Sequence, residues 1–196
     1  MMIRSVANQD LMFQASVAMT WRQMTLNAGA PIYRVPLIAA AAASSAGTVV
    51  GLAKAAKDVF FQRLPERKIT YTTYEHQKDA PLTHLQVADV AMKIDEAEFH
   101  AHRLAALVDV KGVENATWTL EERARAELGA LCRLAKEAVD ILAGASGGSS
   151  IYHTVPMQRI LRDVQAINLH ALMHPNTNLE LYGRVLCGLE PNTMYI

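Results

Sequence analysis

A long uncharged segment constrains the fold of this chain more than any other feature. The segment "VPLIAAAAASSAGTVVGLA", Val35–Ala53, carries no charged side chain and is long enough to cross a bilayer as a helix. It consists mainly of Ala, Ser and Gly, which insert into membranes less readily than Leu or Ile. We therefore expect a helix that is buried on nearly all sides of a helical bundle, and no membrane span.

Apolar residues recur at spacings of three and four through most of the remaining chain, between definite breaks. Proline and glycine positions set the ends of the expected helices. The pattern predicts helices over 36–62, 83–110, 119–143, 156–173 and 178–188. These lengths are typical of an all-α fold: an antiparallel four-helix bundle over residues 31–196, with a short C-terminal helix. Residues 1–30 have weak periodicity and form a lead-in segment.

Charge and cysteine usage narrow the classes of partner and compartment. The chain has 19 basic and 19 acidic residues and therefore no formal net charge. No basic stripe is visible, so we expect no nucleic-acid partner. Cys132 and Cys187 lie on separate predicted helices, and we interpret both as reduced core thiols of a cytoplasmic protein.

The histidine pattern does not predict a metal centre. A carboxylate-bridged di-iron site in a bundle needs Glu-x-x-His pairs, and none of the seven histidines has an acid three positions before it. His170 and His174 are four residues apart, which would place them on one face of the predicted 156–173 helix. That spacing suits zinc, but no third ligand accompanies it, so we predict no metal.

Two stretches near the last long helix carry alternative interpretations. "GASGGSS", Gly144–Ser150, offers backbone N–H groups and close approach before a helix, or is simply a helix end and a turn. In "MQRILRD", Arg159 and Asp163 have the spacing of an ion pair on one helix face. Such a pair at a surface contributes little to stability.

The order of several motifs resembles a known family. "GAPIYRVP", an alanine-rich helix, "FFQRLPERK", a long helix, "GASGGSSIYHTVPMQRILRD" and "INLH" follow one another as in the C-terminal helical domain of the acyl-CoA dehydrogenase superfamily. The branch that it resembles most is the reduced-flavin-dependent monooxygenases, the oxygenase components of two-component hydroxylases. The resemblance covers roughly residues 30–190.

This resemblance implies an activity and its co-reactants. A separate flavin reductase would supply reduced flavin, FMNH2 or FADH2, which would react with O2 to form a C4a-hydroperoxide. That species would hydroxylate an aromatic or heteroatom-containing small molecule. Family members of this kind are about twice as long, with an N-terminal helical domain and a middle β-domain. Residues 1–30 would then be the end of a missing β-domain, and a second chain would supply the absent domains.

The resemblance also implies cofactor-binding residues. Gly147 and Gly148 match the glycine pair that lies against the flavin, and Ser149 belongs to the same run. Arg63 or Arg67 matches the arginine that reaches a flavin phosphate of a neighbouring subunit, which implies a homotetramer or a dimer. The "QRxxRD" motif, which contains Arg159, Arg162 and Asp163, would anchor the last long helix to the bundle.

His170 matches a histidine that faces flavin and substrate in the hydroxylase branch, and His174 is a weaker catalytic candidate. A histidine at this point suits the deprotonation of a phenol or the steadying of a hydroperoxide near neutral pH. The dehydrogenases carry a catalytic glutamate at about the position of Ala171. Because that acid is missing, an acyl-CoA dehydrogenase-like oxidoreductase ranks last. The other alternative is a non-catalytic oligomerising or assembly subunit that completes a flavin site on another chain.

Overall fold

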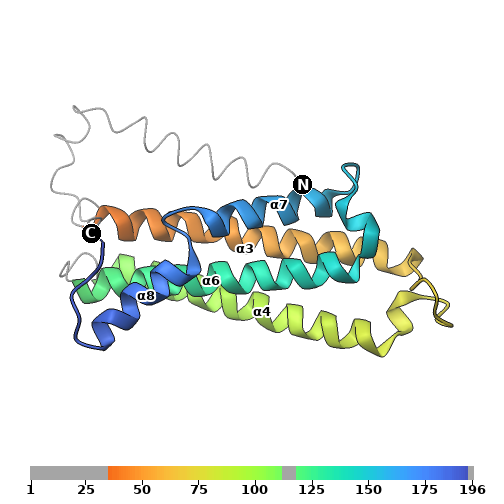
Figure 1. Cartoon of the computed structure of the whole chain (residues 1–196), viewed down its shortest axis with the longest axis horizontal. Helices are drawn as coiled ribbons and strands as arrows, with labels where there is room; N and C mark the ends of the chain where they lie inside the picture. Colours follow the sequence, from red (N-terminus) through yellow and green to blue (C-terminus); the bar gives the residue numbers. More distant parts are fainter. Residues whose placement is uncertain (1–34, 112–117, 194–196) are drawn as a thin grey trace.

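A computed structural model describes residues 35–111 and 118–193, and residues 1–30 of the lead-in segment lie outside them. Within these ranges the chain is helical and contains no strand. Four long elements alternate in direction, and a shorter one closes the chain at the end where α7 finishes (Figure 1). They are α3 (Leu37–Arg63), α4 (Pro81–Ala106), α6 (Trp118–Ala145), α7 (Pro156–Leu169) and α8 (Pro175–Leu186). The predicted all-α, antiparallel four-helix bundle with a short C-terminal helix is confirmed.

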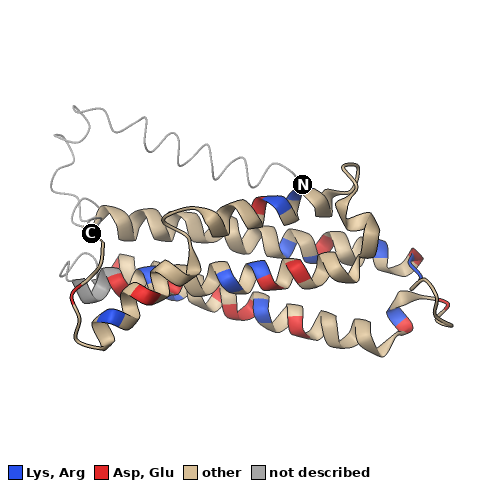
Figure 2. Ribbon diagram, viewed as in Figure 1, with Lys and Arg blue, Asp and Glu red and all other residues tan. Residues whose placement is uncertain are grey.

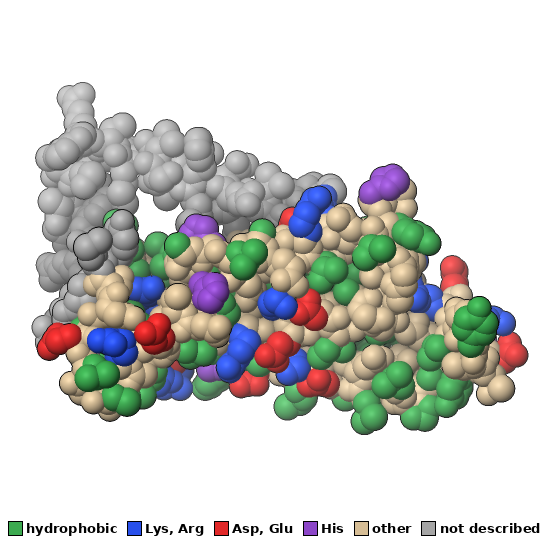
Figure 3. All heavy atoms as spheres, in the orientation of Figure 1, with side chains coloured by type: hydrophobic (Ala, Val, Ile, Leu, Met, Phe, Trp, Pro, Cys, Tyr) green, Lys and Arg blue, Asp and Glu red, His purple; other side chains and the backbone are tan. Residues whose placement is uncertain are grey.

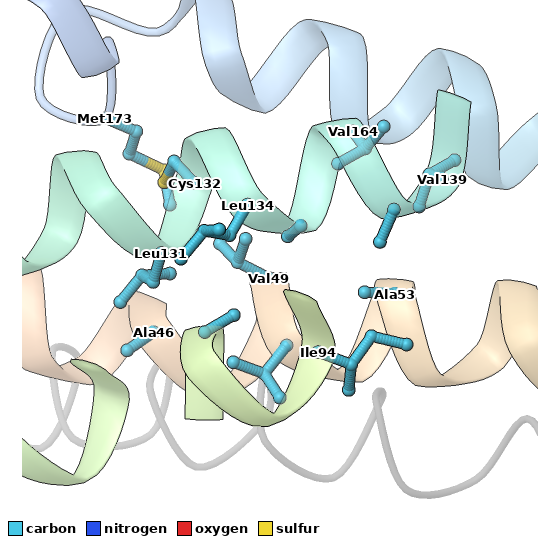
Figure 4. Packing of buried hydrophobic residues seen from close by; sticks show 14 of the residues in the cluster. Ala46, Val49, Ala53, Ile94, Leu131, Cys132, Leu134, Val139, Val164 and Met173 are labelled. Atoms are coloured by element: carbon cyan, nitrogen blue, oxygen red, sulfur yellow. The ribbon is translucent and has the colours of Figure 1, made fainter. Parts of the chain in front are cut away.

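The helix α6 lies at the centre of the bundle, because it packs against α3, α4, α7 and α8. Small residues of α3, such as Ala46 and Ala53, face Leu131 of α6 and Ile94 of α4 (Figure 4). Alanine on one helix allows leucine and isoleucine on its neighbours to fill the space between the axes. The core therefore runs along the length of α6.

The uncharged segment forms the N-terminal half of α3, which carries no Lys, Arg, Asp or Glu (Figure 2). Our expectation that it is buried on nearly all sides was wrong, since Ser44, Gly47 and Gly51 are exposed. Leu37–Glu66 is long and apolar enough to span a membrane, with a mean hydropathy of 1.5 and 33% of its most apolar window buried. Core helices of globular proteins also meet this criterion. The buried residues of α3 recur at spacings of three and four: Ala39, Ala42, Ala46, Val49, Val50, Ala53, Ala56 and Phe60.

The predicted helix over 156–173 ends four residues early, and a turn separates it from the next helix. The helix α7 ends at Leu169, and His170 has an extended backbone. Pro175 begins α8, and the residue before a proline is disfavoured in the helical region, so His174 is also extended. The backbone N–H groups of Met173 and His174 both donate to the carbonyl of His170, which closes the turn.

Two smaller expectations were also wrong. Within the described ranges Arg159 and Asp163 form no ion pair, and both Arg159 and Arg162 are exposed, so the "QRxxRD" motif does not fasten α7 to the bundle through these side chains. Cys132 is a buried thiol, as predicted, and burial raises its pKa to about 12. Cys187, however, lies exposed at the end of α8.

A buried carboxylate joins three helices near the end where α8 lies. Glu127 of α6 is 1% exposed and accepts hydrogen bonds from Arg123 of the same helix and His100 of α4. Arg103 of α4 lies 3.2 Å from the same carboxylate. Arg123 in turn donates to the hydroxyl of Tyr182 in α8, at 3.0 Å. A buried acid needs such partners, and here they fasten α4 and α8 to α6.

Candidate functional site

Arg67 holds together three segments at the glycine-rich end of the bundle. It follows α3 and the short 3-10 turn Leu64–Glu66. Its Nε donates to Oε1 of Gln77 at 2.9 Å, its Nη1 donates to Oγ of Ser149 at 3.0 Å, and its Nη2 donates to the carbonyl of Ser146. Burial, followed by the nearby charge of Arg63, lowers the pKa of Arg67 from its usual value.

Arg63, the last residue of α3, lies beside Arg67, and not all of its N–H groups are hydrogen-bonded. Its Nη2 donates to the same Ser149 oxygen at 3.4 Å, whereas its buried Nη1 has no hydrogen-bond partner. In the part of the chain that the structure describes, neither arginine forms an ion pair with a carboxylate. Two adjacent guanidinium groups without an acid, one with an unsatisfied buried N–H, suit a phosphate or diphosphate. The donor set therefore fits the phosphate portion of a flavin nucleotide.

The glycine run closes this end of the bundle as a 3-10 turn over Gly147–Ile151. Gly147 has a φ of 57°, in the left-handed region that favours glycine. Gly148 lies in open space, because a Cβ there would meet no atom within 4 Å. Both glycines are exposed, so a ligand can approach the backbone closely at this point.

The two candidate catalytic histidines lie on the turn between α7 and α8 and do not share a helix face. His170 is exposed, and its Nδ1 accepts a hydrogen bond from the backbone N–H of Leu172 at 3.2 Å. His174 is the N-cap of α8, and its Nδ1 accepts from the backbone N–H of Thr177 at 3.5 Å. An N-cap side chain stabilises its helix, so His174 already has a structural task.

A cleft opens beside this turn, between α6, α8 and the segment that follows α8. Ala171 and His174 line it, together with Arg125 and Glu180. By the resemblance to the dehydrogenases, their catalytic glutamate would fall at about Ala171. Ala171 contributes only a methyl group to the cleft, so no carboxylate stands at this position, although Glu180 lines the same cleft.

The structure thus divides the predicted site between the two ends of α7. Arg63, Arg67, Gly147 and Ser149 meet before the helix begins, and Gly148 is adjacent. His170 and His174 follow its other end (Figure 1). A helix of 14 residues separates the two groups by about 20 Å at a rise of 1.5 Å per residue. A single isoalloxazine ring is too small to contact both groups on one chain.

The family assignment rests on the part of the chain that contains both groups. The sequence profile of the acyl-CoA dehydrogenase C-terminal domain matches residues 43–175. This chain belongs to that family.

Curated relatives of this acyl-CoA dehydrogenase-like domain are oxygenases. It is 27% identical to the oxygenase subunit HsaA, a flavin-dependent monooxygenase of Rhodococcus jostii, over 82% of this chain and 42% of the relative. It is 26% identical to a pigment production hydroxylase of a Rhodococcus species, over 81% of this chain and 41% of the relative. The domain therefore spans about two fifths of the length of these curated relatives.

Solved structures give the same fold. XiaF from a Streptomyces species, in complex with FADH2 and glycerol, superposes with a TM-score of 0.79 and 30% identity, over 85% of this chain and 42% of that one. The 3-HSA hydroxylase from Rhodococcus sp. RHA1 gives a TM-score of 0.69 over 86% of this chain and 44% of that one. Its identity is 22%, so this second match shows the fold alone.

Three residues that organise the acyl-CoA dehydrogenase-like site escaped prediction from the sequence. Gln77 accepts from Arg67 and donates to the carbonyl of Ala145 at 2.8 Å. Arg125 and Asn178 are buried beside the histidine turn. Gln77 lies in a polar connection without a periodic pattern. Arg125 and Asn178 are bonded to each other although 53 residues separate them in the chain. No local spacing marks such contacts.

Proposed function

We propose that this chain is the helical part of a reduced-flavin-dependent monooxygenase that hydroxylates an aromatic or heteroatom-containing small molecule in the cytoplasm. The observation that carries the proposal is the pair Arg63 and Arg67, which lies against the Gly147–Ser149 turn and has no acid partner in the described ranges. The similarity to flavin-dependent oxygenases supports it. Reduced flavin, supplied by a separate reductase, provides the chemistry that activates O2 when it is bound.

The residues of this chain would bind and orient the flavin and its substrate. Arg63 is the better candidate for the flavin phosphate, because its Nη1 is unsatisfied, whereas Arg67 is occupied with Gln77 and Ser146. FADH2 is the flavin we propose, since the similar XiaF structure contains it. His170 would offer its free Nε2 to the reacting groups, and His174 would hold the turn from which His170 projects.

The separation of the two groups supports a site that is shared between two copies of the chain. Arg63 of one copy and His170 of another would meet the same flavin in a homodimer or homotetramer. This chain spans 42% of HsaA, and we propose that a second polypeptide, similar to other parts of the relatives, completes the substrate pocket. Substrate selectivity would then depend largely on that second polypeptide.

An anaerobic titration of the chain with FADH2 tests the binding part of the proposal. Arg63→Ala should raise the Kd about tenfold, as expected for the loss of one charge-assisted hydrogen bond. Arg133→Ala is the matched control, because Arg133 is an exposed residue that faces Glu137 at 4.0 Å, and its replacement should leave the Kd unchanged. An unaltered Kd in the Arg63 variant would contradict the proposed phosphate site.

A product assay with the assembled oxygenase tests the chemical part of the proposal. His170→Ala should divert O2 to hydrogen peroxide and lower the yield of hydroxylated product, while FADH2 binding is retained. His102→Ala is a control, since His102 is 81% exposed on α4 and lies far from the α7–α8 turn in sequence. An unchanged product yield would remove His170 from the mechanism.

An exposed apolar stripe on α4 favours the second candidate function, a non-catalytic oligomerising subunit. Leu85, Met92 and Phe99 are seven residues apart and are 71%, 68% and 58% exposed. Hydrophobic side chains follow the lower edge of the molecule, where α4 runs (Figure 3). A repeat of seven suits a helix of a second copy. A stable oligomer that Met92→Glu dissociates, together with no FADH2 binding in any oligomeric state, would favour this function over the first.

A further inference from the structure

A chain of hydrogen bonds runs from the interior of the bundle to the histidine turn. Arg125 of α6 is 8% exposed, and its Nε donates to Oδ1 of Asn178 at 2.9 Å. Asn178 of α8 is fully buried, and its Nδ2 donates to the carbonyl of Leu172 at 2.8 Å. The guanidinium fixes which end of the amide accepts and which donates, because Arg has no acceptor atom.

The position of Asn178 is set by the backbone of α6. A Cβ added to Gly129 would lie 2.9 Å from Cβ of Asn178 and 3.1 Å from the carbonyl of Pro175. Gly129 is four residues after Arg125, so both lie on the same face of α6. The missing side chain leaves a notch that receives Asn178, and the guanidinium lies directly beside it. The side-chain amide therefore has little freedom to turn away from Leu172.

Leu172 connects this buried pair to His170. While its carbonyl accepts from Asn178, its N–H donates to Nδ1 of His170 at 3.2 Å. A backbone amide is always a donor, so the Nδ1 atom that it meets carries a lone pair and no proton. In the neutral imidazole the single N–H then lies on Nε2, the atom that is free to meet a ligand.

We propose that Arg125 and Asn178 are positioning residues that hold the Leu172 backbone and thereby commit the neutral His170 ring to the Nε2–H tautomer. In this form His170 donates a hydrogen bond to an oxygen atom of its ligand and does not accept a proton from it. The identity of that ligand rests on the proposed function. Of the two roles that the sequence suggested for His170, the arrangement selects hydrogen-bond donation over deprotonation of a phenol.

Imidazole nitrogen resonances of the full chain, recorded without flavin at about pH 9, where imidazoles are neutral, test the tautomer. His170→Asn assigns the signals of the ring by their loss. We expect a pyridine-like Nδ1 and a pyrrole-like Nε2 in the native chain. A protonated Nδ1, or averaged signals from two tautomers, would overturn the proposal.

Asn178→Asp tests whether the buried pair is responsible. The carboxylate still accepts from Arg125 and has nearly the same size, but it cannot donate to the Leu172 carbonyl. We expect averaged tautomer signals and exchange of the Leu172 amide hydrogen about tenfold faster, as for the loss of one hydrogen bond. Unchanged signals and exchange in a folded variant would show that the pair does not position His170.

Two further variants keep this test decisive. Thr83→Val removes a buried hydroxyl without a hydrogen-bond partner, in the first turn of α4, and should leave the His170 signals unaltered. If Asn178→Asp does not fold, Gly129→Ala displaces the amide without removing any polar atom and should produce the same mixing of tautomers. Because these measurements need no flavin, they remain valid if His170→Ala leaves hydroxylation intact and the proposed function fails.

Discussion

The glycine-rich end and the histidine end of α7 are built in different ways. At the glycine-rich end, the single side chain of Arg67 joins the end of α3, the 77–79 turn and the 147–151 turn. At the histidine end, the backbone turn of residues 170–174 positions the functional groups, and buried residues of α6 and α8 hold that turn. Long side chains are enough to assemble an anion site, whereas a histidine that donates a hydrogen bond to a ligand needs a fixed ring orientation. The comparison predicts that the two ends respond to different kinds of substitution.

Loss of the buried carboxylate of Glu127 should cause the largest destabilisation, in the half of the bundle that contains the histidine end. Glu127→Ala leaves Arg123, His100 and Arg103 without their shared acceptor, and we expect unfolding to require about 3 kcal/mol less. Glu137→Ala is the control, because this acid is 42% exposed and its pair with Lys93 should contribute less than about 1 kcal/mol. Urea denaturation measures both, and equal losses would contradict the structural role of Glu127.

Arg67→Ala should have the next largest effect, at the glycine-rich end. Gln77 and the Ser146 carbonyl lose a donor, which should lower the free energy of unfolding by about 2 kcal/mol. The neighbouring Lys68→Ala breaks only an exposed contact with Glu75 at 3.2 Å and should cost less than about 0.5 kcal/mol. Hydrogen exchange should increase at residues 77–80 and 145–151 only in the Arg67 variant. Exchange spread evenly over the bundle would count against a local tether.

Gly129→Ala should distinguish the histidine end from the glycine-rich end more sharply, because the added methyl group overfills the notch beside Asn178. Overpacking outweighs the gain in helix propensity, and we expect a net loss of about 1–2 kcal/mol. Gly51→Ala, in the exposed face of α3, meets no atom within 4 Å and should instead stabilise the chain by about 0.5–1 kcal/mol. Thermal unfolding should give opposite signs for these variants. Stabilisation by both would show that α8 does not pack in a notch.

Gly147→Ala should have the smallest effect of the four, about 1 kcal/mol, because an L-residue pays a conformational cost at a φ of 57°. Gly148→Ala lies in open space and should leave the stability almost unchanged. Both variants should be compared for FADH2 affinity as well as stability. Weaker binding in the Gly148 variant alone would show that this glycine, though dispensable for the fold, contacts the flavin.

The fold could be predicted from the sequence because helix periodicity and helix breaks are local signals. The limits of α3 and α6 follow from proline, glycine and the apolar stripes, and the structure reproduces them closely. The end of α7 could not be predicted, since residues 170–173 suit a helix locally. Their turn depends on Pro175, on Asn178 and on the notch at Gly129, which lies on another helix.

The candidate site could be predicted only in part, for the same physical reason. Motif order pointed to Arg63, Arg67, Gly147 and Ser149, and the structure brings these four together. The sequence did not indicate which arginine keeps an unsatisfied N–H group, because Gln77 in the connection between α3 and α4 occupies Arg67. It also did not indicate the tautomer of His170, which depends on the N–H of Leu172.

The tether made by Arg67 also has a consequence for the order in which the bundle folds. Its contact with Ser146 closes a loop of 79 residues, and the contact between Gln77 and Ala145 closes one of 68. Contacts between such distant residues form after local helices have appeared. Arg67→Ala should therefore leave the folding rate nearly unchanged and accelerate unfolding, so that the glycine-rich turn is assembled last and opens first.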